Sequence, residues 1–184
     1  KNEHDELLDI LPQTDLFIVN TCSVRQKSED KVYGLGKVFS QLKNKGEKVP
    51  YTIISGCMVG SATGDRRRSK LRELKEKTSW ANYYMNPAQI FDLPEILKNE
   101  NQLGKWALKK FNPNNVETVQ FEDKKGYINI SDGCDNFCTY CVVPFAREKE
   151  VSRSEEEILA EAKHLANRGY KSIMLCGQNV NSWG

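Results

Sequence analysis

The chain has 184 residues, a net charge of +2 and an apolar fraction of 39%. This length suffices for one large or two small domains with a buried core, and the nearly balanced charge permits a nucleic-acid partner without indicating one. No apolar run approaches the ~18 residues of a membrane span, and residues 1–6 carry no apolar signal segment. A cytoplasmic location without membrane contact is therefore predicted.

Six cysteines and the two chain ends add further expectations. A chain of this size does not need disulfides, and in a reducing compartment closely spaced thiols indicate metal ligands. The chain starts without methionine and ends just after a predicted strand, so we expect it to be part of a longer protein.

The first hundred residues alternate apolar runs with amphipathic stretches. Runs at 15–19 and 51–54 are rich in β-branched residues and predict buried strands, with a third short strand over 80–85. Helices are predicted before Pro12 and over 23–42, 66–77 and 88–99. This alternation predicts an α/β fold with a parallel sheet, whose chemistry lies beyond the carboxyl ends of its strands.

Two cysteines follow predicted strands directly. Cys22 lies after the first strand and Cys57 after the second, so both thiols are expected on the same rim of the sheet. The alternative is that each is a small buried apolar residue, as free cysteines often are.

A change of composition marks a domain boundary. Between 99 and 125 the sequence becomes rich in Asn, Lys, Gln and Glu, which predicts a first domain over 1–112, a linker over 113–125 and a second domain over 126–184. In the second domain, a strand over 127–131, a helix opened by Ser154 and closed near Gly169, and a strand over 171–176 predict the first βα units of a (β/α) partial barrel.

The most specific motif lies between that domain's first strand and its helix. Cys134, Cys138 and Cys141 have the spacing C-x3-C-x2-C. Three thiolates can bind three irons of a [4Fe-4S] cluster and leave the fourth iron open for a substrate. A structural zinc site normally needs four ligands in paired groups, and no fourth Cys or His lies in or close behind the motif. The pattern favours a cluster, although the three cysteines alone leave zinc open.

With its flanks, this motif resembles the radical S-adenosylmethionine (SAM) superfamily. Further segments occur in the order seen in MiaB-type tRNA methylthiotransferases, and together they cover nearly the whole chain: Asn20–Arg25, Gly56–Met58, Phe91–Glu95, Gly133–Arg147, Glu150–Arg153 and Gly177–Asn181. The resemblance implies an N-terminal methylthiotransferase domain with its own [4Fe-4S] cluster, then a radical SAM barrel, then a small RNA-binding TRAM domain. Only the first and part of the second are expected within this chain.

The resemblance also implies roles for individual residues. The SAM-binding cluster would be ligated by Cys134, Cys138 and Cys141. The second cluster would be ligated by Cys22 and Cys57, and its third ligand is expected in a segment that this chain does not contain.

Further positions match SAM-binding segments of the family. Tyr140 matches the aromatic residue beside the adenine, and Gly177, Gln178 and Asn179 match the segment that holds the methionyl moiety. Two positions depart from the pattern and put the detailed shape of the cysteine loop in doubt, because a Gly and a Pro are usual where this chain has Glu148 and Ser154.

The arginines have milder interpretations. The run at 66–68 predicts a solvated helix face, with contact to RNA phosphates as the alternative. Arg147 and Arg153 lie beside the cysteine loop, where either can pair with a SAM carboxylate or an RNA phosphate. Cys176 ends an apolar strand and is expected to pack rather than to ligate.

The function implied is conversion of N6-isopentenyladenosine in the tRNA anticodon loop to its 2-methylthio derivative, by a transferase using two [4Fe-4S] clusters and SAM. Expected partners are tRNA, an electron donor such as flavodoxin or ferredoxin, and a sulfur donor, and a monomer is expected. Two alternatives remain. One is a methylthiotransferase acting on threonylcarbamoyl-adenosine tRNA or on a ribosomal protein, and the other is a non-enzymatic module that binds a cluster or zinc.

Overall fold

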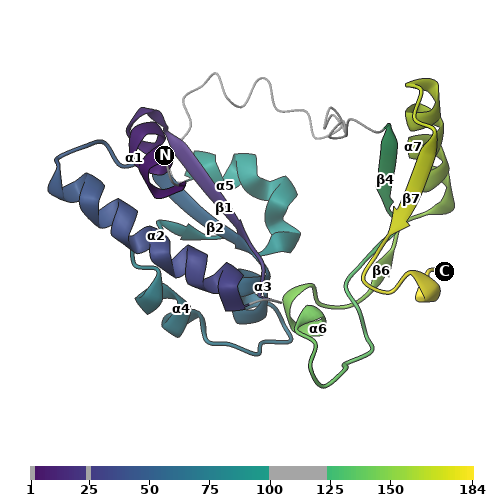
Figure 1. Cartoon of the computed structure of the whole chain (residues 1–184). Helices are drawn as coiled ribbons and strands as arrows, with labels where there is room; N and C mark the ends of the chain where they lie inside the picture. The colour runs from purple at the N-terminus through teal and green to yellow at the C-terminus, as the bar shows by residue number, and fades with distance from the viewer. Residues whose placement is uncertain (1–2, 24–25, 100–123) are drawn as a thin grey trace.

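The computed structural model describes residues 3–23, 26–99 and 124–184. The predicted boundary between 112 and 113 lies outside these ranges. The N-terminal half (Figure 1) contains α1 (Glu3–Ile10), η1 (Leu11–Gln13), β1 (Leu16–Thr21), α2 (Gln26–Asn44), β2 (Tyr51–Gly56), α3 (Cys57–Thr63), α4 (Leu71–Lys77), β3 (Tyr83–Tyr84), η2 (Pro87–Asp92) and α5 (Leu93–Asn99).

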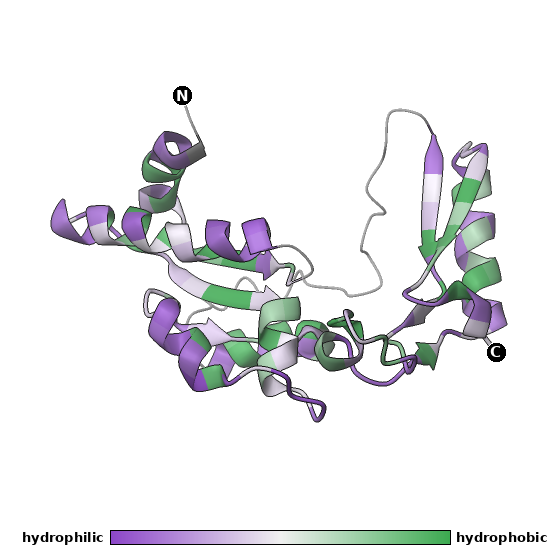
Figure 2. Ribbon diagram, turned by 60° about the horizontal axis from the view of Figure 1, so that its bottom comes forward, coloured by the Kyte–Doolittle hydropathy of each residue, from purple (hydrophilic) through white to green (hydrophobic). Residues whose placement is uncertain are grey.

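The N-terminal half is built on a parallel sheet in the order β1-β2-β3. Successive side chains of a strand point to opposite faces of the sheet. On the central strand β2, the side chains of both faces are buried. Ile54 packs in a cluster with Val32 and Met58 on one face, while Ile53 packs with Ile96 and Leu97 of α5 on the other. This arrangement confirms the predicted α/β fold, and Figure 2 shows the apolar residues gathered along the strands.

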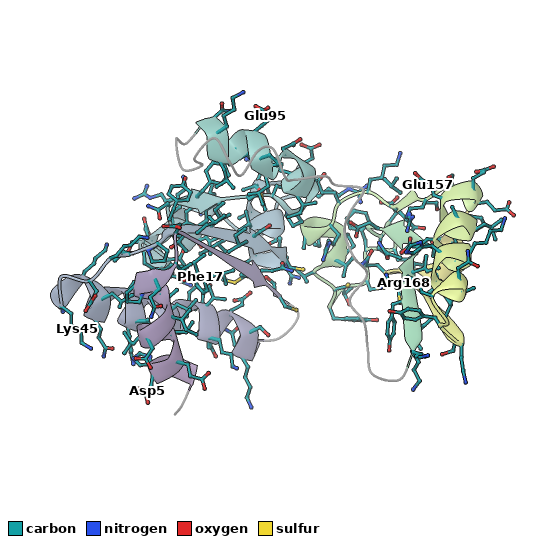
Figure 3. All side chains as sticks on the ribbon, turned by 90° about the horizontal axis from the view of Figure 1, so that it is seen from above. Asp5, Phe17, Lys45, Glu95, Glu157 and Arg168 are labelled. Atoms are coloured by element: carbon teal, nitrogen blue, oxygen red, sulfur yellow. The ribbon has the colours of Figure 1, made fainter. Side chains whose placement is uncertain are left out.

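A third apolar cluster joins α1 and η1 to α2. Phe39 lies between two aromatic rings, stacked on Trp80 with centroids 4.8 Å apart and tilted against Phe17 at 6.3 Å. Figure 3 shows Phe17 inside this half, with charged side chains such as Lys45 at its periphery. Stacked and tilted ring pairs of this kind add to the energy of apolar burial.

Three predicted elements of this half are shorter than expected. The helix predicted over 66–77 forms only over Leu71–Lys77, because the backbone N–H groups of Arg68 and Ser69 donate to Ser61 O at 2.9 and 3.0 Å. The third strand is reduced to Tyr83–Tyr84. The helix predicted over 88–99 divides into η2 and α5, with Pro94 in the first turn of α5, where its missing N–H is tolerated.

The C-terminal half contains β4 (Lys125–Asn129), β5 (Ser131–Asp132), α6 (Val143–Ala146), β6 (Val151–Ser152), α7 (Glu155–Asn167), β7 (Ser172–Cys176) and η4 (Val180–Ser182). Strands β4 and β7 pair in parallel, and β5 pairs antiparallel with β6. Helix α7 covers one face of the β4–β7 pair, where Leu165 packs on Ile128 with 0% of its surface exposed.

Both predicted ends of α7 are confirmed. Ser154 Oγ accepts a hydrogen bond from Glu157 N at 3.3 Å, and Gly169 follows the helix with φ +82°. This β-loop-α-β order is the predicted beginning of a barrel. Tyr127, Met174 and Leu175 of the β4–β7 pair remain exposed. Among the residues described, no helix has both the length and the hydropathy needed to cross a bilayer.

Candidate functional site

The carboxyl ends of β1 and β2 bring Cys22 and Cys57 to one rim, as the sequence predicted. Thr21 pairs in register with Gly56, and each cysteine is the next residue. Cys22 is exposed, whereas Cys57 begins α3 and is 9% exposed. A Cβ on Gly56, whose φ is +92°, would overlap the backbone of Thr21, so glycine is required at this turn.

Sequence reasoning missed the residue that ties this rim together. Thr21 Oγ1 donates to Ser55 O at 2.6 Å and accepts from Met58 N at 3.3 Å. One buried hydroxyl thus fixes the end of β1 against the start of α3. The signal available in sequence was its place directly before Cys22 at the end of an apolar run.

The cysteine loop leaves β5 and returns to β6. Cys134 is buried, and its N–H donates to Glu148 O at 3.3 Å. Gly133 and Glu148 both have positive φ angles, +79° and +64°, so the two ends of the loop meet through left-handed residues. Glu148, where relatives of the resembled family usually have Gly, therefore keeps the backbone conformation that a glycine would adopt.

The other two cysteines of the motif lie on the turn that leads into α6. Cys138 is exposed, and its carbonyl oxygen accepts from Cys141 N at 2.9 Å. Cys141 Sγ accepts from Val143 N at 3.4 Å. Hydrogen bonds to the sulfurs of an iron–sulfur cluster help to set its reduction potential.

The fit of these thiols to a cluster rests on donor chemistry. Sulfur donors without histidine suit iron–sulfur clusters. Nowhere in residues 3–23, 26–99 and 124–184 are three or more Cys, His, Asp or Glu side chains gathered as a metal-binding group. The exposed turn around Cys138 would have to draw the sulfurs together on binding, and the ligand assignments stay predictions.

The segment expected to hold the methionyl end of SAM follows the carboxyl end of β7. Asn129 of β4 pairs in register with Cys176 of β7, so Gly177 leaves the sheet beside the start of the cysteine loop. A Cβ on Gly177 would lie 2.5 Å from Ser131 Oγ, which explains the glycine. Gln178 is exposed, and Asn179 precedes η4.

A cavity of about 610 Å³ lies between the N-terminal half and the cysteine loop. Ser23 and Met58, the neighbours of Cys22 and Cys57, line one part, and Tyr140 and Cys141 line another. The Tyr140 side chain is 86% exposed. The volume is typical of small-molecule sites. Of the cysteines predicted as ligands, Cys141 lines this cavity, and Cys22 and Cys57 are the chain neighbours of residues that line it.

The polar lining of this cavity is of mixed charge. Arg68, Lys70 and Lys77 face it together with Glu29 and Glu73. Tyr33 also lines it, and burial, reinforced by Glu29 and Asp30, raises the pKa of this phenol above its ordinary value. A phenol with an ordinary or a raised pKa is protonated at neutral pH, so Tyr33 is a hydrogen-bond donor there.

Helices α3 and α6 meet closely beside the cavity. A Cβ on Gly60 would overlap the carbonyl oxygen of Ala146, and one on Gly64 would overlap the carboxylate of Glu148. Close approach of backbone to backbone needs a residue without a side chain. Gly60 therefore allows α6 to pack against α3, whereas the contact at Gly64 is with the end of the Glu148 side chain.

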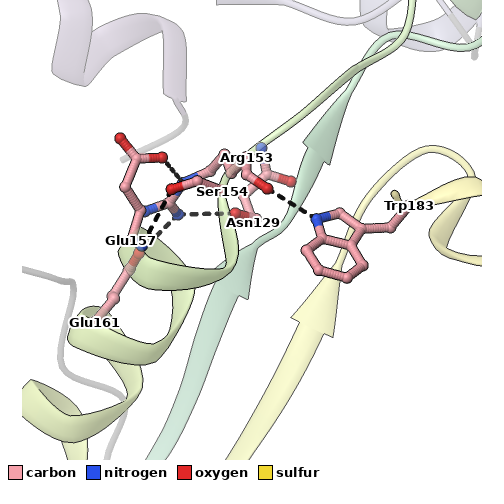
Figure 4. A network of polar contacts seen from close by, with 6 residues as sticks. All are labelled: Asn129, Arg153, Ser154, Glu157, Glu161 and Trp183. Carbon is pink, nitrogen blue, oxygen red and sulfur yellow. Dashed lines mark hydrogen bonds and ion pairs between the residues drawn. The ribbon is translucent and has the colours of Figure 1, made fainter.

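The arginines beside the loop are engaged within the protein. Arg153 Nη1 donates to Asn129 O at 2.8 Å and to Glu161 Oε2 at 2.7 Å, and the Arg153 carbonyl accepts from Trp183 Nε1 at 2.9 Å (Figure 4). Arg147 lies 3.6 Å from Asp132 Oδ2. Arg153 thus joins β4, α7 and the residues after β7.

Arg66 does not lie on a helix face. Its Nη1 donates to Asp135 Oδ1 at 2.6 Å, and this hydrogen bond holds the pKa of Asp135 below its ordinary value. The predicted solvated helix face is therefore wrong for Arg66, because residues 66–70 run as an irregular segment toward the cysteine loop.

Two family models match different parts of the chain. Residues 128–183 match the model of the radical SAM superfamily, and residues 1–80 match that of "Uncharacterized protein family UPF0004". The chain thus carries a UPF0004 segment followed by the start of a radical SAM domain. This order confirms the predicted fold class.

Individual relatives specify the resemblance. The chain is 38% identical over 180 residues to the tRNA-2-methylthio-N(6)-dimethylallyladenosine synthase of Desulfitobacterium hafniense (strain Y51), covering 95% of this chain and 38% of the relative. It is 38% identical over 184 residues to the synthase of Finegoldia magna, covering 98% of this chain and 38% of the relative. It is 36% identical over 179 residues to the synthase of Bacillus mycoides (strain KBAB4), covering 94% of this chain and 33% of the relative.

The predicted resemblance to methylthiotransferases is therefore confirmed over nearly the whole chain. The chain spans 38% of the length of the Desulfitobacterium relative.

Proposed function

We propose that the protein containing this chain is a cytoplasmic radical SAM methylthiotransferase. Its substrate is N6-isopentenyladenosine in the anticodon loop of tRNA, and its product is the 2-methylthio derivative. The names of the relatives support this substrate. An unpaired loop base is accessible to such an enzyme, because it can enter a pocket without the opening of a duplex.

The observation that carries the proposal is a cavity bordered by the chain neighbours of Cys22 and Cys57 and by one cysteine of the loop. Its lining includes the residues that follow Cys22 and Cys57 and, across from them, Cys141 itself. A base in this cavity would lie between a sulfur-donating site on the rim of the N-terminal sheet and a radical-generating site on the cysteine loop. The reaction needs both next to one carbon atom.

The proposal assigns the cysteines to two separate cluster sites. In the proposal, Cys134, Cys138 and Cys141 hold the SAM-binding [4Fe-4S] cluster, while Cys22 and Cys57 hold a second cluster with a ligand from elsewhere in the protein. A SAM-bound cluster supplies one-electron hydrogen abstraction from a carbon that ionic chemistry does not activate.

The other residues orient the reactants. Tyr140 offers its exposed ring to the adenine of SAM, and the segment Gly177–Asn179 holds the methionyl end beside the cysteine loop. Tyr33, as a protonated phenol, can donate a hydrogen bond within the cavity.

The protein would also need partners. A flavodoxin or ferredoxin would supply electrons. A separate donor would replace the sulfur that is transferred to the substrate. The protein itself would act as a monomer. The alternative is a methylthiotransferase that acts on threonylcarbamoyl-adenosine tRNA or on a ribosomal protein. The substrate experiment below separates this alternative from the proposed function.

The first experiment tests the radical chemistry. In the full-length protein, Cys138→Ala should abolish formation of 5′-deoxyadenosine from SAM and leave the spectrum of the N-terminal cluster intact. The matched control is Cys176→Ala, which should keep SAM cleavage. Undiminished cleavage by Cys138→Ala would remove the radical SAM assignment.

The second experiment tests the substrate. The full-length protein should add a methylthio group to tRNA that carries N6-isopentenyladenosine and leave tRNA with unmodified adenosine unchanged, as measured by mass analysis of the nucleosides. Preference for threonylcarbamoyl-adenosine or for a ribosomal protein would favour the alternative.

A further inference from the structure

The segment after α3 crosses from the N-terminal half to the cysteine loop. Its last part is fixed to α3, because Ser61 O accepts from the N–H groups of Arg68 and Ser69 and Ser61 Oγ lies 3.1 Å from Ser69 Oγ. The arginine side chains of this segment are therefore presented from a backbone with a defined path.

Two of these arginines contact the loop that carries Cys134, Cys138 and Cys141. Arg66 Nη1 donates to Asp135 Oδ1 at 2.6 Å, and the guanidinium carbon lies 4.9 Å from the centroid of the Phe137 ring. The Arg68 guanidinium carbon lies 5.7 Å from the Phe145 ring. Phe137 and Phe145 are themselves packed edge to face at 5.8 Å.

These contacts form one unit across the two halves. The carboxylate and the two rings belong to the loop and α6, whereas both cations come from the N-terminal half. Arg66 and Asp135 have 29% and 44% of their side chains exposed, so the pair is partly shielded from water. Partial shielding strengthens both the charge-assisted hydrogen bond and the cation–π contact relative to a fully exposed pair.

We infer that Arg66, assisted by Arg68, is a positioning residue that holds the cysteine loop against the N-terminal half. Asp135 and Phe137 lie between Cys134 and Cys138, so the contact acts on the part of the loop that carries these thiols. The role goes beyond the proposed function, because it concerns the relative placement of the two cysteine sets and not the chemistry at either.

A contact to RNA phosphate is the other role open to a basic run. Arg66 is disfavoured for it, because its guanidinium already has a carboxylate and an aromatic ring as partners. If Arg66 bound RNA instead, Arg66→Ala would change the affinity for tRNA and the salt dependence of that affinity. It would leave the cysteine loop unchanged in the absence of RNA.

Hydrogen exchange of the full-length protein, without cluster or RNA, tests the inference directly. In Arg66→Ala and in Asp135→Ala, the backbone amides of 133–148 should exchange about fivefold faster, and those of β1 and β2 should keep their rates. The matched control is Arg72→Ala, because Arg72 pairs within α4 with Glu76 at 2.9 Å and leaves the loop untouched. Arg72→Ala should leave 133–148 at the wild-type rate.

A charge reversal separates positioning from a general loss of stability. Arg66→Asp and Asp135→Arg should each speed exchange of 133–148, and the double variant should return it toward the wild-type rate. Unchanged exchange in Arg66→Ala, an equal rise across β1 and β2, or failure of the double variant to restore the loop would each overturn the inference.

A measurement on the loaded enzyme extends the test and rests on the proposed function. If the loop is misplaced, Arg66→Ala should form more 5′-deoxyadenosine per methylthio group transferred than the wild type does, and Arg72→Ala should not. An unchanged ratio would overturn the catalytic consequence of positioning. Absence of both products in the wild type would instead contradict the proposed function and leave the exchange result standing.

Discussion

Glu148 closes the cysteine loop in a backbone conformation that favours glycine. Its φ is +64°, its carbonyl oxygen accepts from Cys134 N, and its carboxylate lies over Gly64 of the segment after α3. A residue with a Cβ in the left-handed region is strained by roughly 1–2 kcal/mol. Glu148 therefore strains the backbone but gives the loop a side-chain contact with the N-terminal half.

We predict that Glu148→Gly raises the free energy of unfolding by about 0.5–1 kcal/mol, because glycine relieves the strain and loses part of this gain to the entropy of the unfolded chain. Denaturation with urea measures it. Glu148→Ala is the control, since alanine keeps the strain and removes the carboxylate, and it should not stabilise. Equal destabilisation by both variants would mean that the left-handed backbone of Glu148 carries no measurable strain.

Gly60 is predicted to be intolerant of any side chain. A Cβ there meets the Ala146 carbonyl oxygen, which is backbone and cannot rotate away, so Gly60→Ala should lower the free energy of unfolding by about 1–3 kcal/mol. Gly34→Ala in α2 is the matched control. It meets nothing within 4 Å and should raise the free energy of unfolding by about 0.5–1 kcal/mol. Equal effects of the two variants would mean that α6 moves freely away from α3.

At the scale of elements, Arg153 joins three parts of the C-terminal half: β4, α7 and the residues after β7. Its guanidinium connects the β4 carbonyl of Asn129 to the carboxylates of Glu157 and Glu161 on α7, and its own carbonyl holds Trp183 (Figure 4). The helix is thereby fixed over the strand beyond what apolar packing on Leu165 provides.

Arg153→Ala should lower the free energy of unfolding of this half by about 1–3 kcal/mol, since it leaves a part-buried carboxylate and a carbonyl without their charged donor. Thermal unfolding followed by circular dichroism measures the change. The matched control on the same helix is Lys163→Ala, whose side chain is exposed, and its effect should stay within about 0.5 kcal/mol. Equal transition temperatures for Arg153→Ala and the wild type would show that the network is not stabilising.

At the scale of the whole molecule, the proposed site draws on two cysteine sets that are distant in sequence and lie near one cavity. Tyr140 and Cys141 come from the loop, and Ser23 and Met58 come from the rim of the N-terminal sheet. A protein with only one of these parts would have half of the proposed site.

The two sets should each account for one cluster. Anaerobically reconstituted full-length protein should bind about eight irons, and Cys134→Ala and Cys57→Ala should each bind about four, as measured by iron and sulfide analysis. Cys176 is the internal control, because its Sγ lies 3.7 Å from Met174 O within the β4–β7 pair, and Cys176→Ala should keep about eight. A loss of about four irons in Cys176→Ala would make this thiol a ligand.

Local patterns predicted much of the fold. The strands around 15–19 and 51–54, the cap at Ser154 and the glycine at 169 follow from hydropathy and from the backbone preferences of neighbouring residues. Such signals act over a few positions, so a single sequence contains them. The irregular path of 66–70 could not be predicted in this way, because a charged helical pattern was overridden by hydrogen bonds to Ser61 and by the pair with Asp135.

The sequence by itself predicted the class of chemistry, since the spacing of Cys134, Cys138 and Cys141 and the motifs around it are properties of adjacent residues. It also placed Cys22 and Cys57 on one rim, because parallel strands end at a common edge. Only the tertiary structure decided which half touches the cysteine loop. The Arg66–Asp135 pair joins residues 69 positions apart, and contacts of that range depend on how whole elements pack, which no local pattern records.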